Sequence, residues 1–323
     1  MFKLTITKIS IFTVALFVIL VNVAQTKTAQ ANIAVADDAS ILQQKYHNLT
    51  EQLKSNQFKR PIHLDSVESS STIKGDIYAV IDYPFSTVNG ALNDPTQGPS
   101  NWCDVLILHV NTKYCRASNE SKGPVLNMYV GKKVRQELAD AYHLQFDYRP
   151  VATTKDYFQV DLNADGGPLG TKDYHIVLEA ASINNKQTFI HLTYGYGYGL
   201  AGRVAMKTYL NTIGSGKVGF SKMEAIDTGS PQSQDAAEQY VGGVRGLVER
   251  NTMRYYLAID AYLSTINETP EKRMEQRLNN WFNATEQYPK QLHELDRQDY
   301  MQMKFEELNR QKTKLELSTI KLN

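Results

Sequence analysis

Hydrophobic and polar residues alternate along the middle of the 323-residue chain, between residues 72 and 199. In "TIKGDIYAVID" (72–82), apolar side chains recur at every second position, as in a half-buried strand. The same period returns in residues 125–134, 141–149, 156–164, 173–181 and 187–199. Short links rich in Asn, Asp, Gly or Lys separate these segments. This pattern predicts a curved, meandering antiparallel sheet of about six or seven strands.

Helical spacing flanks this sheet on both sides in the sequence. Apolar side chains in residues 38–56 are three or four positions apart, which predicts a helix. A short helix is predicted over residues 200–214. A long helix is predicted over residues 242–266, where a wide apolar stripe follows one face. The tail after Pro270 is helical in pattern and rich in charge. We therefore predict an α+β fold with helical extensions at both ends.

Polar residues interrupt the long predicted helix in "VERNTMRYYL" (248–257). Glu249, Arg250 and Arg254 are close enough along a helix to form salt bridges on an exposed face. We expect these charges to be solvated. Arg245 and Asn251 could instead point toward a cavity under the helix.

The first 31 residues have the composition of a secretory signal peptide. Lys3 and Lys8 precede an apolar run from Ile11 to Val21, and "AQA" ends at Ala31 as a small-x-small cleavage site. The apolar run is too short to span a bilayer. We therefore expect cleavage after Ala31, a periplasmic location and no membrane span in the mature chain.

Net charge excludes nucleic acid as an expected partner. Residues 1–31 hold three lysines and no acids, so 32 basic residues remain against 34 acidic ones, a net charge of −2. Such a chain has no strong field to attract nucleic acid or anionic lipid. The two cysteines of an exported protein are expected to pair.

Both cysteines lie in "NWCDVLILHVNTKYC" (101–115). As one extended strand, this segment would hold Cys103 and Cys115 about 40 Å apart, whereas a disulfide needs Cα atoms about 4.4–6.8 Å apart. A hairpin would place its turn among residues that do not favour turns. A helix over residues 101–109, with Ser100 as its N-cap, rises only about 13 Å. The residues that follow it are then long enough to bring Cys115 back to Cys103. We predict a Cys103–Cys115 disulfide, with a reactive cysteine beside the nearby histidine as the alternative.

Two motifs resemble functional sites but do not have the required spacing. "DLNADGGPLGTK" (161–172) opens like a calcium loop, but its twelfth position is Lys172 instead of a bidentate acid, so we predict a hairpin turn. The seven histidines show no metal-binding spacing, and no serine lies in a G-x-S-x-G motif. We expect no metal, no cofactor and no hydrolase chemistry.

The second motif, "TYGYGYG" (193–199), is read as the end of a strand and not as a phosphate-binding loop. Its three glycines would lie on one face of the strand and its three tyrosines on the other. Because glycine lets another group approach the backbone closely, we expect either a helix or a ligand to pack against the glycine face, with a helix favoured. His191 would lie on that same face.

The order of elements over residues 72–266 resembles the helix-grip fold of START-like and polyketide-cyclase-like (SRPBCC) proteins. The resemblance implies a sheet wrapped around a long C-terminal helix, with a cavity between them. It divides the chain into a signal peptide (1–31), an N-terminal helical extension (32–61), a helix-grip domain (62–266) and a C-terminal helical extension (267–323). An insertion at 214–241 leaves open whether helix 200–213 or helix 243–266 fills the grip.

The chain also resembles exported proteins of proteobacteria that share "WCD…LH…KYC" and "VGG…G…ERNTMRYYLAI", a resemblance that implies no activity. We expect a protein that binds a hydrophobic or amphipathic, lipid-like molecule, because 19 tyrosines and 11 phenylalanines can line and orient such a ligand. The candidate ligand contacts are Trp102, His109, Tyr148, His191, Tyr194, Tyr196, Arg245, Asn251 and Tyr255. The alternatives are a cyclase/aromatase-like enzyme and a periplasmic adaptor that binds a protein through its helical extensions.

Overall fold

A computed structural model describes residues 38–211, 216–223 and 239–320. The predicted signal peptide and much of the predicted insertion lie outside these residues. The described strands form one antiparallel sheet in the order β1-β2-β8-β7-β6-β5-β4-β3. In chain order they are β1 (Ile62–Glu68), β2 (Thr72–Ile81), β3 (Thr112–Glu120), β4 (Gly123–Val130), β5 (Tyr142–Thr153), β6 (Tyr157–Gly166), β7 (Thr171–Ser182) and β8 (Thr188–Tyr198).

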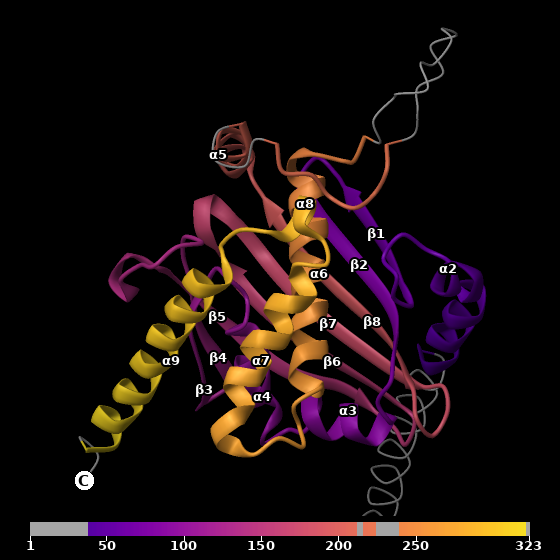
Figure 1. Cartoon of the computed structure of the whole chain (residues 1–323), viewed down its shortest axis with the longest axis horizontal. Coiled ribbons are helices and arrows are strands. Elements are labelled where there is room, and N and C mark those ends of the chain that lie inside the picture. The colour runs from indigo at the N-terminus through magenta and orange to yellow at the C-terminus, as the bar shows by residue number, and fades with distance from the viewer. Residues whose placement is uncertain (1–37, 212–215, 224–238, 321–323) are drawn as a thin grey trace, which may run out of the picture.

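Helices lie on both faces of this sheet (Figure 1). They are α2 (Thr50–Lys54), α3 (Phe85–Leu92), α4 (Gly98–Leu106), α5 (Leu200–Asn211), α6 (Gly243–Leu263), α7 (Pro270–Thr285), α8 (Pro289–Leu292) and α9 (Arg297–Ile320). Residues 38–48 are also helical, as predicted. They pack with α2 on the outer face of the sheet, where Leu42, Leu49 and Leu53 contact a cluster that includes Phe189.

The order of elements confirms the helix-grip prediction. Two short helices, α3 and α4, follow β2, six antiparallel strands come next, and the long helix α6 lies across β1, β2 and β8 (Figure 1). The described sheet has eight strands where six or seven were expected, because β1 adds an outer edge next to β2. Helix α6 fills the grip, and α5 packs against α6 and the turn between β6 and β7. That turn is the predicted hairpin in 161–172.

The glycine face of β8 does not receive the helix, contrary to the prediction. A Cβ placed on Gly195 would lie 2.5 Å from His175 Nε2, so this face meets a side chain of β7. The close approach of helix to sheet occurs instead at Gly75 on β2. A Cβ there would lie 2.4 Å from Thr252 Oγ1 on α6. The tyrosine side chains of β8 therefore point toward α6, into the space between the sheet and this helix.

The charges of α6 are buried, which corrects the expectation of a solvated face. Glu249, Arg250 and Arg254 are each at most 1% exposed. Glu249 is covered by β1 and by residues 220 and 221, whose backbone N–H groups it accepts, and Arg250 donates to the Val218 carbonyl. Arg254 is covered by α7 and by the end of α8, both of which contact α6. Trp281 of α7 donates its indole N–H to the Arg254 carbonyl at 3.1 Å. Helix α6 is thus a central element between the sheet and an outer layer.

The predicted disulfide joins Cys103 of α4 to Cys115 of β3, with Cα atoms 5.1 Å apart. It pins a helix to the first half of the next strand, as expected. Helix α4 begins at Gly98, so Ser100 lies inside it and is not the N-cap. Pro99 explains the earlier start, because proline suits the first turn of a helix.

Candidate functional site

Polar side chains, most of them aromatic, lie together between β7, β8 and α6. Their members are His109, Tyr174, Tyr194, Tyr196, Asn251 and Tyr255, which we call the interior polar cluster. Tyr194 and Tyr196 alternate along β8 and point toward α6, where the Tyr194 and Tyr255 ring centroids are 5.1 Å apart. Asn251 lies one helical turn before Tyr255 on α6. The strand period and the helix period thus bring these residues to the same place.

His109 reaches the cluster from the connection between α4 and β3. Its ring centroid is 5.1 Å from that of Tyr255. Nδ1 accepts the backbone N–H of Asn111 at 3.1 Å, so the proton of the neutral ring is on Nε2. Nε2 lies beside the Asn251 side chain, yet no described residue forms a hydrogen bond of acceptable geometry with it. The Asn251 side chain is therefore the polar partner of the His109 ring within the cluster.

The cluster is buried except at Asn251. His109, Tyr194 and Tyr196 are 4%, 5% and 4% exposed. Asn251, which interacts with both His109 and Tyr194, is only partly buried. Asn251 therefore marks the place where the interior polar cluster meets solvent.

Burial keeps the titratable groups of the cluster neutral. Burial, followed by the charges of Arg254, Lys304 and Lys133, holds the pKa of His109 well below its usual value. Burial likewise raises the pKa of Tyr194 far above 10 and the pKa of Tyr174 to about 12. A general acid or base works best with a pKa near the working pH, and these side chains are far from it. They can donate and accept hydrogen bonds instead.

An ion cluster borders the interior polar cluster. Glu294, just after α8, accepts hydrogen bonds from Arg254 and Lys133, both at 2.5 Å, and Lys217 lies 3.7 Å away. Arg254 also donates to the Asn251 amide oxygen at 3.3 Å, which links the ions to the cluster. Burial lowers the pKa of Lys133 to about 8. This ion cluster was not predicted from the sequence, because Glu294 is 40 residues from Arg254.

Five of the nine predicted ligand contacts thus lie together, namely His109, Tyr194, Tyr196, Asn251 and Tyr255. Trp102 and Tyr148 lie elsewhere, because both donate to the Leu92 carbonyl, at 3.0 and 3.1 Å, where α3 ends. Their role here is to fix α3 and α4 to the sheet. Tyr174 was not predicted. It lies on the buried face of β7, where its ring stacks on Tyr196 with centroids 5.0 Å apart.

The other two predicted contacts lie apart from the cluster. Arg245 donates to Ser66 on β1 at 2.7 Å and lies 3.7 Å from Glu249. His191 is on the outer face of β8, where it interacts with Asp76 at 2.9 Å and with Glu179 at 2.7 Å. Successive residues of a strand face opposite sides, so His191 cannot share a site with Tyr194.

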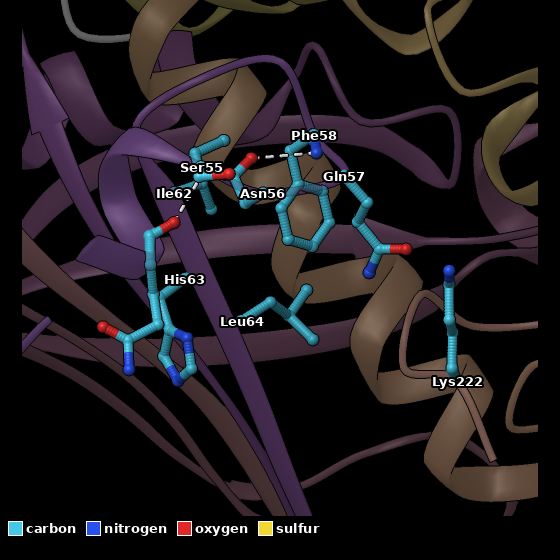
Figure 2. Close-up of a pocket in the computed structure, with 9 residues that line it drawn as sticks. Ser55, Asn56, Gln57, Phe58, Ile62, His63, Leu64 and Lys222 are labelled. Atoms are coloured by element: carbon cyan, nitrogen blue, oxygen red, sulfur yellow. Dashed lines mark hydrogen bonds between the residues drawn. The ribbon is translucent and has the colours of Figure 1, made fainter. Parts of the chain in front are cut away.

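A separate surface pocket of about 350 Å³ lies between the end of α2, strand β1 and residues 216–223. Figure 2 shows Phe58 and Leu64 near its centre, with Gln57 and Lys222 on one side and His63 on the other. The Gln57 amide also donates to the Phe220 carbonyl at 2.8 Å. None of the predicted ligand contacts lines this pocket, so it is distinct from the interior polar cluster.

No metal site or membrane span emerges from residues 38–211, 216–223 and 239–320. Within them, no three His, Cys, Asp or Glu side chains are placed to hold a metal ion. The helices in the same ranges are too short or too polar to cross a bilayer.

No family model matches the sequence, and no curated protein matches it significantly. Among solved structures, norcoclaurine synthase from Thalictrum flavum is 12% identical, with 46% of this chain and 89% of that chain covered and a TM-score of 0.32. The Zhui aromatase/cyclase from Streptomyces sp. R1128 is 13% identical, with coverages of 42% and 70% and a TM-score of 0.27. Human STARD10 is 10% identical, with coverages of 53% and 75% and a TM-score of 0.28.

These likenesses are too distant to carry an argument about activity. The order of the elements and the sheet topology define the protein as an α+β protein with the helix-grip fold. Between the sheet and α6 lies the interior polar cluster, whose side chains burial keeps neutral.

Proposed function

We propose that the protein is exported and binds a hydrophobic or amphipathic small molecule between the sheet and α6. The observation that carries this proposal is the interior polar cluster. Its tyrosine rings offer apolar area, and its hydroxyl, amide and imidazole groups offer a few oriented hydrogen bonds, which is the usual composition of a small-molecule site. The partly buried Asn251 supplies a route from the surface.

The same cluster favours binding over catalysis. A cyclase or aromatase would need a group that gives or takes a proton near neutral pH. His109 and Tyr194 are held in their neutral forms by burial, as the directions of their pKa shifts indicate. Neutral, buried donors suit recognition of a ligand.

An adaptor role receives less support, because the helical extensions use their apolar faces within the protein itself. Leu42, Leu49 and Leu53 pack on the outer face of the sheet. In α9, Tyr300 is 1% exposed and donates to the Leu108 carbonyl at 2.9 Å. These side chains are therefore used within the protein itself.

Export to the periplasm is part of the proposal. It is supported by the sequence of residues 1–31 and by the pairing of both cysteines, since disulfides persist in oxidising compartments.

Native mass spectrometry and solvent extraction of the protein isolated from the periplasm would test the proposal. We expect a co-purifying hydrophobic or amphipathic molecule. Tyr194→Phe removes one hydroxyl of the cluster and should lower the loaded fraction. Tyr157→Phe is the control, because Tyr157 is also buried but donates its hydroxyl to Glu179 on the outer face. A wild-type protein that carries no such molecule and takes up no apolar fluorescent probe would refute the proposal.

A further inference from the structure

The surface pocket between the end of α2, strand β1 and residues 216–223 has an apolar base. Phe58 and Leu64 lie near its centre (Figure 2), and Ile62 lines it as well. Phe58 packs against Phe220 and Tyr288, with ring centroids 5.6 and 6.4 Å from its own. This packing holds the Phe58 ring in place, so the base is a fixed apolar surface inside a concave site.

The polar residues that line the pocket are uncharged apart from Lys222. They are Gln52, Ser55, Asn56, Gln57 and His63. Burial lowers the pKa of His63, so its ring is neutral at pH 7. No carboxylate is among the described lining residues. Lys222 is exposed, so solvent and salt screen its charge. The pocket therefore has little attraction for an ion of either sign.

Three of these polar side chains have hydrogen-bonding groups to offer to a ligand. Gln52 and Ser55 are exposed, and in the described part of the chain neither side chain forms a hydrogen bond with another residue. The His63 ring forms none either. Asn56, in contrast, accepts the Phe58 N–H at 2.9 Å and so fixes the turn. An amide, a hydroxyl and a neutral imidazole can each donate and accept, which matches the hydrogen-bonding capacity of a hydroxyl group.

The edge of the sheet beside the pocket is poorly suited to a peptide. Strand β1 is the outermost strand on this side. The Ile62 N–H already donates to the Arg60 carbonyl at 2.7 Å. The Ser66 N–H already donates to the Asp65 carboxylate at 2.8 Å. An extended peptide that adds to a sheet edge needs such backbone groups for its own hydrogen bonds. Recognition in this pocket therefore depends on side chains.

We propose that this pocket binds a neutral carbohydrate, a mono- or oligosaccharide. A pyranose ring has apolar C–H bonds on its faces, and one face would lie on the base formed by Phe58 and Leu64. Its hydroxyl groups would exchange hydrogen bonds with Gln52, Ser55 and His63. The site is separate from the proposed one between the sheet and α6 and does not depend on it. Because an open pocket covers only part of its ligand, we expect a Kd of about 1 mM for a disaccharide.

Saturation-transfer NMR on the wild-type full-length mature protein would test this proposal. The probes are maltose, cellobiose and N,N′-diacetylchitobiose, with sorbitol and a neutral capped tripeptide of glycine and leucine for comparison. We expect at least one disaccharide to bind about tenfold more tightly than sorbitol, which has hydroxyl groups but no apolar ring face. Absence of disaccharide binding at about 10 mM would overturn the proposal. Tighter binding of the tripeptide than of every disaccharide would overturn it too.

Two substitutions at exposed positions test whether the sugar lies in this pocket. Ser55→Trp fills the pocket with an indole ring and should abolish binding of the preferred disaccharide. Gln52→Ala removes one amide and should weaken binding about three- to tenfold. Gln276→Ala is the matched control and should leave the Kd unchanged, because Gln276 is an exposed glutamine that donates to Asn280 within α7 at 3.0 Å.

Full binding by Ser55→Trp would place the sugar elsewhere and overturn the proposal. If that variant does not fold, Gln52→Ala decides, and a Kd equal to that of Gln276→Ala would contradict the assignment of the site.

Discussion

His191 on β8 occupies an ionic site that is unusual for a strand residue, because both of its ring nitrogens face carboxylates. Asp76 of β2 and Glu179 of β7 lie on its two sides, at 2.9 and 2.7 Å, and Tyr78 stacks on the ring with centroids 4.2 Å apart. Burial lowers the pKa of His191, but the hydrogen bonds to Asp76 and Glu179 outweigh burial and raise it. For Asp76, the hydrogen bonds from His191 and Lys74 outweigh burial and hold its pKa at about 2. The imidazolium therefore ties three neighbouring strands together.

We predict that His191→Phe lowers the free energy of unfolding by about 3 kcal/mol at pH 6, because two carboxylates lose their shared cation. A folded-state pKa raised above 6.5 means that the stabilisation is complete below pH 6.5 and decreases as the pH rises through the folded-state value. The stability difference between wild type and variant should therefore shrink between about pH 6 and pH 9. Urea unfolding of both proteins at a series of pH values measures this difference in the free energy of unfolding.

The difference between the two proteins is the informative quantity, since buried lysines also titrate in this range. His143→Phe is the control, because His143 on β5 is exposed and its ring bonds the Asn127 side chain at 3.1 Å, away from any carboxylate pair. That variant should stay within about 0.5 kcal/mol of wild type. A difference between wild type and His191→Phe that is constant over this pH range would show that His191 is not charged in the folded protein.

At the scale of elements, the position of α6 depends on a glycine in the neighbouring strand. Gly75 of β2 faces Thr252, whose hydroxyl donates to the Val248 carbonyl at 2.8 Å within α6. A Cβ on Gly75 would lie 2.4 Å from that hydroxyl oxygen. Helix and sheet are in contact here with no room for a methyl group.

We predict that Gly75→Ala lowers the free energy of unfolding by about 1–3 kcal/mol, because α6 or its threonine must move. In a Thr252→Ala background the same change should cost clearly less, since the clashing oxygen is gone. Chemical denaturation of the four proteins of this double-mutant cycle measures the coupling.

Gly90→Ala serves as the control for the glycine itself. Gly90 is exposed in α3, and a Cβ added there would have no atom within 4 Å, so alanine should stabilise the helix by about 0.5–1 kcal/mol. Equal costs of Gly75→Ala with and without Thr252 would mean that the clash does not determine the packing.

The sequence predicted these elements better than it predicted their environment. Alternation in residues 187–199 identified β8 and separated its tyrosines from its glycines, because strand period is local. It could not tell which face the helix covers, since both tyrosine and glycine faces accept a helix. The burial of Arg254 was missed for a similar reason. Its partner Glu294 and the covering helix α7 lie in a later part of the chain, and helical periodicity contains no information about them.

The length of the chain between the two cysteines predicted the disulfide better than periodicity predicted the packing of helices. The Cys103–Cys115 disulfide followed from the reach of twelve residues and from the two cysteines being the only ones present. The interior polar cluster was predicted in part, because Tyr194, Asn251 and Tyr255 belong to elements with clear periods. His109 belongs to a connection, and its tautomer depends on a backbone contact that no sequence pattern reveals.

At the scale of the whole molecule, the C-terminal helix α9 is locked to the helix-grip domain through buried charges. Lys304 of α9 is 0% exposed and donates to the backbone carbonyls of His109 and Thr112, both at 2.7 Å. Glu307, one turn later, forms ion pairs with Lys113 of β3 and with Lys304. The connection that carries His109 toward the grip is therefore held by a helix 195 residues later in the chain.

We predict that Glu307→Gln lowers the free energy of unfolding by about 3 kcal/mol at pH 7, because Lys113 and Lys304 would be left without their shared carboxylate. Burial lowers the pKa of both lysines, so the unfolded chain binds more protons than the folded one and stability rises as the pH rises. Loss of the carboxylate lowers both pKa values further, so the stability deficit of the variant relative to wild type should decrease between about pH 7 and pH 10.

Glu306→Gln is the matched control, since Glu306 pairs with the exposed Arg135 and its loss should cost less than about 1 kcal/mol. Urea unfolding of both variants measures these values, and equal costs for the two would show that the buried triad does not hold α9 in place.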